Sequence, residues 1–272
     1  MPIHFHLKQA LQVPLECDEL TPNLLADKSV SDINSLTVFS GRRQKQIKDM
    51  FEVTGDDPSQ LEFHGDLTKF RGIGRRMNSG HITVHGSTGM HCGAEMTGGQ
   101  ITVDGSADDW LGAEMKNGTI IVRGNAGKGI GAAYLASPSG MKNGTIIVHG
   151  NADQEVGRKM RRGTIVVRGK AGDLAGLQMI GGTIILKEAI GDHIGAWMKK
   201  GTIVCLQAPI TNHFFSECCE YSPTFLSIYA KHLQQYDVKL PMANTDGQWF
   251  RYIGDASRAG QGELLVRKSA EA

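Results

Sequence analysis

Apolar residues alternate with other residues in seven short segments between residues 80 and 206, and each segment begins at a glycine. In the first segment, Ile82 and Val84 fall on one face of an extended chain, because side chains alternate across a strand. Five of the six steps between the starting glycines are 19 residues long, and the third step is 26. The starting glycines are Gly80, Gly99, Gly118, Gly144, Gly163, Gly182 and Gly201. A fixed period of this length predicts a solenoid, which is first of all a binding surface for partners.

The apolar positions predict columns of buried side chains inside the stack. Stacked parallel strands would align the pairs Ile82/Val84, Ile101/Val103, Ile120/Val122, Ile146/Val148, Ile165/Val167, Ile184/Leu186 and Ile203/Cys205. A second inward column consists of Met77, Met96, Met115, Met141, Met160, Met179 and Met198. Tight bends are expected three residues before most of these methionines, at Gly74, Gly93, Gly112, Gly157, Gly176 and Gly195. We therefore expect an all-β fold, a right-handed parallel β-helix of about seven to eight coils, with the handedness taken from the general preference of parallel crossovers.

The residue between each inward pair points outward and changes character along the chain. It is Thr83 and Thr102 at first, and then an apolar series follows: Ile121, Ile147, Val166, Ile185 and Val204. An exposed apolar row of this length is normally covered. Either the C-terminal helix covers it, through Phe225, Leu226 and Tyr229, or another subunit does. Ile147, Val166 and Ile185 are therefore candidate partner-interface residues.

The 26-residue step places an insertion at residues 134–140, before Met141 resumes the repeat. Insertions in solenoids project from one face and often serve binding. Tyr134 and Leu135 are costly to expose to water, and we count both as further interface candidates.

The sequence divides into three regions. Residues 1–60 form a mixed region with strands at Ile3–Leu7 and Leu36–Phe39, residues 61–208 form the repeats, beginning with a degenerate coil, and residues 209–272 form a C-terminal helix and strands that pack on the β-helix. The helix is expected to begin at Ser222 as the N-cap, with Pro223 at its first position. Two short strands are expected at residues 248–253 and 263–267.

Composition excludes several classes of protein. Glycine is abundant, with 35 residues among 272, but there is no triplet period and proline numbers only 8, which excludes collagen. A net charge of +1 and few aromatic residues disfavour a nucleic-acid-binding protein. The five cysteines show no Cys-x-x-Cys spacing, which suits a reducing compartment. We find no signal peptide or apolar span and expect a cytoplasmic protein.

No self-sufficient active site is evident in the sequence. The glycines near Gly72 and Gly127 fail the dinucleotide and phosphate-loop patterns and belong to the repeats. An outward row of His64, His85 and Asp104 could supply three ligands to zinc, but the row soon turns cationic, and we prefer a polar ladder. We therefore expect no catalytic residue, no metal and no cofactor on this chain.

The repeat units Gly-Thr-Ile-Ile-Val-Arg-Gly-Asn-Ala-Gly and Gly-Ala-Glu-Met-Lys-Asn-Gly-Thr resemble the GXGXG repeats of one superfamily. That superfamily includes the C-terminal β-helix of the large glutamate synthase subunit and the C subunit of formylmethanofuran dehydrogenase. The length, the region before the repeats and the tail after Ser222 resemble the C subunits of the dehydrogenase and of the related formyltransferase/hydrolase complex.

The resemblance implies a non-catalytic scaffold subunit in one-carbon metabolism. Formyl-tetrahydromethanopterin would be converted through formylmethanofuran to formate by a formyltransferase subunit and an amidohydrolase-like subunit, with the metal in a partner. The alternatives are the C subunit of a tungsten or molybdenum formylmethanofuran dehydrogenase, a glutamate-synthase-like structural subunit, and a free-standing enzyme that uses His85 and Asp104. Methanofurans carry acidic glutamyl tails, so we note a basic set that could contact them: Arg75, Arg76, Arg161 and Arg162.

Overall fold

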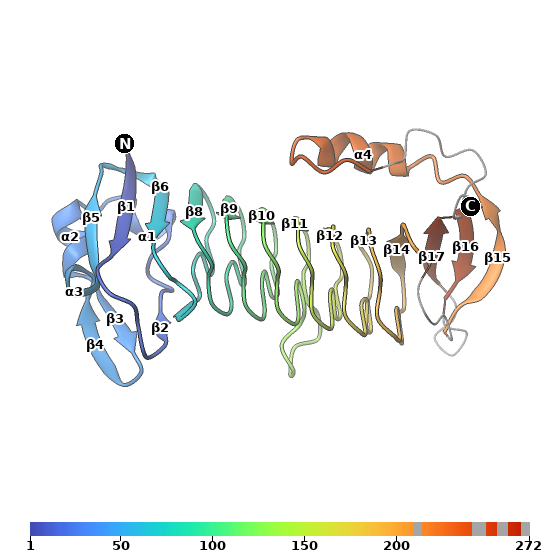
Figure 1. The fold of residues 1–272 in the computed structure, drawn as a ribbon, viewed down its shortest axis with the longest axis horizontal. Helices are drawn as coiled ribbons and strands as arrows, with labels where there is room; N and C mark the ends of the chain where they lie inside the picture. Colours follow the sequence, from blue (N-terminus) through green and yellow to red (C-terminus); the bar gives the residue numbers. More distant parts are fainter. Residues whose placement is uncertain (209–213, 241–248, 255–260, 268–272) are drawn as a thin grey trace.

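The computed structural model describes residues 1–208, 214–240, 249–254 and 261–267. Strands dominate the described chain: one sheet has thirteen strands and a second has four (Figure 1). The described helices are short. They are α1 (Pro22–Leu25), α2 (Val30–Ser35), α3 (Ile47–Met50) and α4 (Leu226–Gln234). No helix among the described residues has the length and apolar character needed to cross a lipid bilayer.

Seven strands of the large sheet come from the repeats and lie side by side along the long axis (Figure 1). They are β8 (His81–His85), β9 (Gln100–Val103), β10 (Thr119–Val122), β11 (Thr145–Val148), β12 (Thr164–Val167), β13 (Thr183–Leu186) and β14 (Gly201–Cys205). All of them pair in parallel, and equivalent residues face each other, as Ile146 faces Ile165 and Ile165 faces Ile184. The period and the register predicted from the sequence are thus confirmed.

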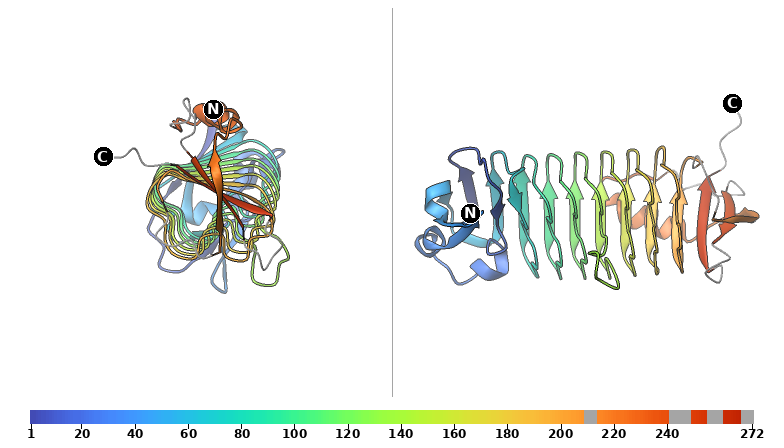
Figure 2. Two further views of the ribbon diagram at one scale, coloured as in Figure 1. Left: turned by 90° about the vertical axis from the view of Figure 1, so that its right-hand side faces the viewer. Right: turned by 90° about the horizontal axis from the view of Figure 1, so that it is seen from below.

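A second line of parallel bridges follows each repeat strand, and it runs from Leu67 through Thr88 and the equivalent alanines to Ile190. Viewed along the stack, successive repeats superimpose (Figure 2). The predicted inward pairs and the methionine column are all buried, with at most 1% of each residue exposed. Burial of long apolar columns from one repeat to the next supplies the main stabilisation of such a stack.

The N-terminal end extends the large sheet beyond the repeats. Strand β6 (Asp57–His64) pairs with β8 in the repeat register, which confirms residues 61–77 as a first, degenerate repeat. Beyond β6 lie β1 (Pro2–Leu7), parallel to it, and β5 (Phe51–Thr54), antiparallel to β1. The smaller sheet consists of β4 (Arg43–Gln46), β3 (Thr37–Ser40), β2 (Leu15–Glu16) and β7 (Phe70–Arg71).

The C-terminal end closes the stack with three more strands. Strand β17 (Gly262–Arg267) continues the parallel sheet on β14, and β16 (Trp249–Ile253) and β15 (Ser216–Tyr221) follow in antiparallel order. The sequence predicted β16 and β17 but not β15. The predicted helix start was wrong: α4 begins at Leu226 with Phe225 as its N-cap residue. The N–H of Leu226 donates to the carbonyl of Pro223 (3.0 Å), so a tight turn precedes the helix and Ser222 does not cap it.

Helix α4 lies over the outward face of the later repeats (Figure 1). Leu226, Leu233 and the partly buried Phe225 and Tyr229 pack in a second hydrophobic cluster with four members of the outward apolar row, Ile147, Val166, Ile185 and Val204. The Tyr229 hydroxyl lies 2.9 Å from the Thr183 hydroxyl oxygen, which ties the helix to β13. The predicted intramolecular cover is confirmed. The interface candidates Ile147, Val166 and Ile185 are fully buried in this cluster of the chain itself.

Candidate partner and carrier surface

The insertion follows the tight bend of its repeat, and the glycine at that bend, which we call a corner glycine, keeps its usual conformation. Gly131 has a φ of +63°, and a Cβ placed there would lie 2.7 Å from the Cδ1 of Ile165. Gly112 and Gly157 approach the Cδ1 atoms of Ile146 and Ile184 in the same way. The N–H of Met141 donates to the carbonyl of Gly131 at 2.8 Å, so residues 132–140 leave and return at one point. Sequence reasoning missed Gly131 as a corner glycine because the insertion separates it from Met141.

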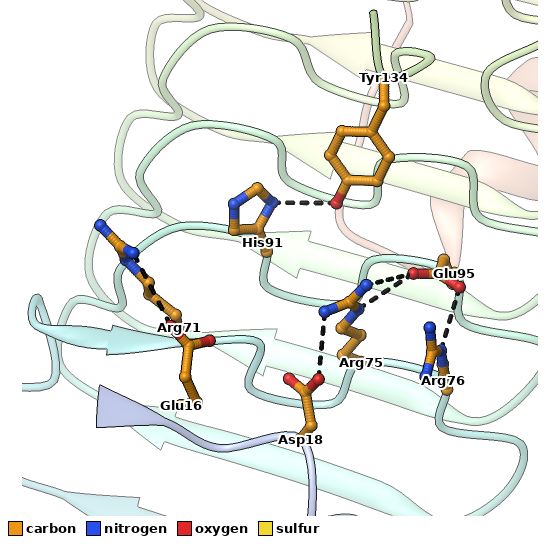
Figure 3. A network of polar contacts seen from close by, with 8 residues as sticks. All are labelled: Glu16, Asp18, Arg71, Arg75, Arg76, His91, Glu95 and Tyr134. Carbon is orange, nitrogen blue, oxygen red and sulfur yellow. Dashed lines mark hydrogen bonds and ion pairs between the residues drawn. The ribbon is translucent and has the colours of Figure 1, made fainter. Parts of the chain in front are cut away.

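Tyr134 anchors the insertion to the repeats (Figure 3). Its hydroxyl lies 2.9 Å from Nδ1 of His91, its N–H donates to the Glu114 carboxylate at 3.1 Å, and its ring centroid lies 5.2 Å from that of Trp110. Burial raises the pKa of Tyr134 to about 12, so its hydroxyl keeps its proton. Burial, and then Arg75 and Arg71, lower the pKa of His91. Leu135, the next residue, is 87% exposed.

Arg75 and Arg76 are held in ion pairs within the chain (Figure 3). Arg75 donates two hydrogen bonds to one Glu95 oxygen (3.0 and 2.7 Å) and one to Asp18 (3.1 Å), and Arg76 donates to the other Glu95 oxygen (3.0 Å). Burial alone would raise the pKa of Glu95, but these guanidinium contacts hold it below its usual range. Two of the four predicted carrier-contact arginines are therefore already paired with carboxylates.

A second basic cluster consists of Arg158, Lys159, Arg161 and Arg162, of which the first two are half-buried and the last two exposed. The Arg158 guanidinium lies 2.8 Å from the Glu155 carboxylate and 5.2 Å from the Trp110 ring centroid. The Lys159 ammonium donates to the carbonyl of Ser137 in the insertion at 3.1 Å. Arg161 and Arg162 are exposed. Lys159 thus holds the insertion in place, and the Arg158 guanidinium donates to the carbonyl of Ala133 directly before the insertion. Arg161 and Arg162 face solvent.

A shallow pocket of about 180 Å³ lies beside the insertion. Pro138 of the insertion, Gln178, Ile180 and the half-exposed Trp197 line it, together with Lys159 and Lys199. We name these six residues, together with Leu135, the insertion surface. Trp197 lies 19 residues after Gln178, one position before Met198, and it holds a φ of +55°. Exposed aromatic side chains such as that of Trp197 are enriched at protein interfaces.

Sequence reasoning missed Trp197. The position directly before every repeat methionine except Met141 carries a large side chain at positive φ, such as Arg76, Glu95 and Gln178. This column of positions could have indicated Trp197, because side chains at these positions project from the corner of the stack.

The outward polar row is formed as predicted, and its neighbours interact. Nδ1 of His85 lies 3.1 Å from the Asp104 carboxylate, to which Arg123 donates a hydrogen bond at 3.1 Å. Further along, Nδ1 of His149 lies 2.6 Å from the Arg168 guanidinium. The N-terminal end of this row lies beside groups that the sequence analysis did not include. Two sets there have the composition of metal ligands: His4, His6 and His64, and Glu62, His64 and His85.

The three buried cysteines offer little nucleophilic chemistry. Cys17, Cys92 and Cys205 are buried, and burial raises the pKa of the Cys92 thiol to about 12 and those of the other two as well. Cys218 and Cys219 are exposed on β15. A thiol with so high a pKa is a poor nucleophile, because only the thiolate reacts. The buried cysteines are therefore packing residues.

Comparisons with known proteins agree with the repeat architecture. The GXGXG motif family matches residues 67–221. The chain is 38% identical over 89 residues to the C subunit of a molybdenum-containing formylmethanofuran dehydrogenase from Methanosarcina barkeri, covering 31% of this chain and 30% of that protein. It is 33% identical over 92 residues to the C subunit of a tungsten-containing formylmethanofuran dehydrogenase from Methanothermobacter wolfeii, covering 32% and 34%. The chain thus spans about a third of the length of these relatives.

A solved structure is similar over nearly the whole chain. It is a chain of the crystal structure of the formyltransferase/hydrolase complex (FhcABCD) from Methylorubrum extorquens in complex with methylofuran. The TM-score is 0.90 at 31% identity, and the alignment covers 97% of this chain and 99% of that one. The chain therefore belongs to the GXGXG motif family, and it is related over nearly its whole length to this chain of the formyltransferase/hydrolase complex.

Proposed function

We propose that this chain is the non-catalytic scaffold, the C subunit, of a formyltransferase/hydrolase complex in one-carbon metabolism. The complex would convert formyl-tetrahydromethanopterin through formylmethanofuran to formate. The observation that carries this proposal is the similarity over 97% of the chain, which includes both ends of the stack as well as the repeats. Short repeat matches alone would indicate only a shared repeat.

The scaffold role requires a rigid framework, and we propose that the stack is a right-handed parallel β-helix. The in-register parallel strands and the second line of bridges support a closed coil. The proposed regions are the N-terminal cap of residues 1–60, the β-helix of residues 61–208 and the C-terminal cap of residues 209–272. The inter-repeat core extends through all three regions, which favours a single rigid body for binding partners.

The proposed partners are a formyltransferase subunit and an amidohydrolase-like subunit in a cytoplasmic hetero-oligomer, with the catalytic metal in the amidohydrolase-like partner. The insertion surface is the proposed interface, because Leu135 is 87% and Trp197 48% exposed. Tyr134 is half-buried against His91 and Trp110, so it would fix the position of the adjacent Leu135. The buried Ile147, Val166 and Ile185 would instead hold α4 on the stack.

The carrier is proposed to be a methanofuran-type molecule, since the similar complex was solved with methylofuran. Of the four basic candidates, Arg161 and Arg162 suit an acidic tail better than Arg75 and Arg76 do. The first two are exposed, while the second two are neutralised by Glu95 and Asp18. Exposed cationic groups attract polyanions through a field that salt screens.

A second candidate function is that of the C subunit in a tungsten or molybdenum formylmethanofuran dehydrogenase, favoured by identities of up to 38% to those subunits. The glutamate-synthase-like alternative rests on the repeats alone, and the free-standing enzyme rests on the His85–Asp104 pair.

Affinity capture of the tagged chain from its native host tests the proposal. We expect a formyltransferase subunit and an amidohydrolase-like subunit to be captured. A molybdopterin subunit with iron–sulfur proteins would instead assign the chain to a dehydrogenase.

A further inference from the structure

Five imidazole and carboxylate side chains meet on one outward face at the N-terminal end of the large sheet. They come from three neighbouring strands, β1, β6 and β8, which lie side by side (Figure 1). In the register of these strands, His4 faces Glu62, and His6, His64 and His85 face one another in a row. Since alternate residues share a face, all five lie on the side opposite the buried Phe5 and Phe63.

Three donor atoms of this group converge. Nδ1 of His4 lies 3.2 Å from Nε2 of His64 and 3.5 Å from Oε2 of Glu62, and the last two atoms are 3.8 Å apart. Zinc binds imidazole nitrogen and carboxylate oxygen at about 2.0–2.2 Å, so the edges of its coordination tetrahedron measure about 3.3–3.6 Å. The three observed separations bracket this edge length.

A fourth donor is also within reach. Nε2 of His85 lies 3.0 Å from the same Glu62 oxygen, and Glu62, His64 and His85 form a set with the composition of a metal site. His6 stacks on His64 with 4.2 Å between ring centroids and 11° between ring planes, which limits the orientation of the ligating ring.

We propose that His4, Glu62 and His64 bind one Zn²⁺ ion, with His85 as the fourth ligand. Three imidazoles and a carboxylate form a nitrogen and oxygen donor set that suits zinc better than magnesium or calcium. The ion would join β1 to the first two repeat strands, because its ligands come from three strands. The site would be structural, and it goes beyond the scaffold role, which assigns no metal to this chain.

Zinc titration of the full-length, metal-free chain tests the site. Calorimetry should give one Zn²⁺ per chain, and the unfolding temperature should rise with zinc concentration, since a ligand that binds only the native state stabilises it. Cobalt(II) in place of zinc should show the intense visible bands of a tetrahedral complex. Absence of binding, or weak binding of several ions without a thermal shift, which indicates an adventitious ion only, would overturn the proposal.

Variants identify the ligands. His64→Ala and Glu62→Gln should abolish the thermal shift and the cobalt spectrum, and His85→Asn, which removes a partly exposed ring, should weaken both without disturbing the fold. The matched control is His81→Ala on β8. His81 is exposed and is not one of the proposed zinc ligands. It should leave the titration unchanged. A His64→Ala chain that folds and still binds one zinc ion would contradict the assignment. Each readout uses the isolated chain, so the result is independent of the partners of the complex.

Discussion

The corner glycine Gly157 lies directly against Ile184 of the second strand that follows it. A Cβ built on Gly157 would lie 2.5 Å from the Cδ1 of Ile184, and Gly157 holds a φ of +68°. Glycine is thus required at this corner both by the backbone conformation and by the close approach of the isoleucine. The same relation recurs at Gly93 with Ile120, at Gly112 with Ile146 and at Gly176 with Ile203.

We predict that Gly157→Ala lowers the free energy of unfolding by about 1–3 kcal/mol, as overpacking does in other cores. Ile184→Val removes the clashing Cδ1 methyl and should cost about 0.5–1.5 kcal/mol alone. In the Gly157→Ala background, the same valine should cost less or should restore stability. Chemical denaturation of the four proteins measures this coupling. Additive effects would show that the two side chains do not meet.

Helix α4 should determine the cost of truncating the outward apolar row. Ile147→Ala removes a fully buried side chain and should cost about 2–5 kcal/mol. Ile121→Ala is the matched control in the same row, where the side chain is only partly buried, and it should cost clearly less. Equal losses in denaturation experiments would mean that the helix does not cover Ile147 in solution.

Stability should fall in mild acid partly because of His149. Its pKa is lowered by burial and then by Arg168 and Arg123, with Asp237 acting in the opposite direction. The unfolded chain takes up a proton near the usual pKa of about 6.5, whereas the folded chain resists until a lower pH, so stability is lost as the pH falls below about 6.5. His149→Asn and Arg168→Gln should both reduce this loss when unfolding is measured from about pH 8 to about pH 5. An unchanged pH profile in both variants would contradict this account.

Arg161 and Arg162 are predicted to assist a carrier with an acidic tail. Changing both to glutamine should slow coupled formyl transfer and hydrolysis in the assembled complex and should reduce its sensitivity to salt, since a long-range attraction is lost. Arg42→Gln with Arg43→Gln removes the same charge from exposed positions at the N-terminal end and is the matched control. Unchanged kinetics in an intact Arg161 and Arg162 variant would leave the chain as a scaffold only.

The periodic features of this fold were predictable, and the local ones outside the period were not. Equivalent residues such as Ile146 and Ile165 face each other because the same short sequence pattern recurs every 19 residues. The apolar residues at outward positions predicted that another element, here helix α4, would cover them. The start of α4 and strand β15 depend on contacts outside the repeats. Likewise, His4 lies beside Glu62 only because β1 pairs with β6. Strand β1 lies outside the repeats, so the repeat period does not predict this pairing. Exposed Trp197 was missed because its column varies from repeat to repeat. The three-region division remains a prediction.

The insertion surface should govern assembly. Trp197→Ala and Leu135→Asp alter side chains that are 48% and 87% exposed, so the chain should remain as stable as the wild type. Exposed aromatic residues often dominate interface energies, and we expect partner capture to fall by at least about tenfold, equivalent to roughly 1.4 kcal/mol. Ile228→Asp on the outer side of α4, where the side chain is 70% exposed, is the control and should capture normally. Full capture by both variants would place the interface elsewhere.

The most direct test of the scaffold role is native mass spectrometry of the formyltransferase and amidohydrolase-like subunits, co-expressed with and without this chain. The account predicts one hetero-oligomer that contains all three subunits and releases formate from the formyl carrier. Without this chain, the two partners should separate and coupled turnover should fall, while this chain alone should release no formate. Partners that assemble and turn over equally well in its absence, or formate release by the isolated chain, would contradict the account.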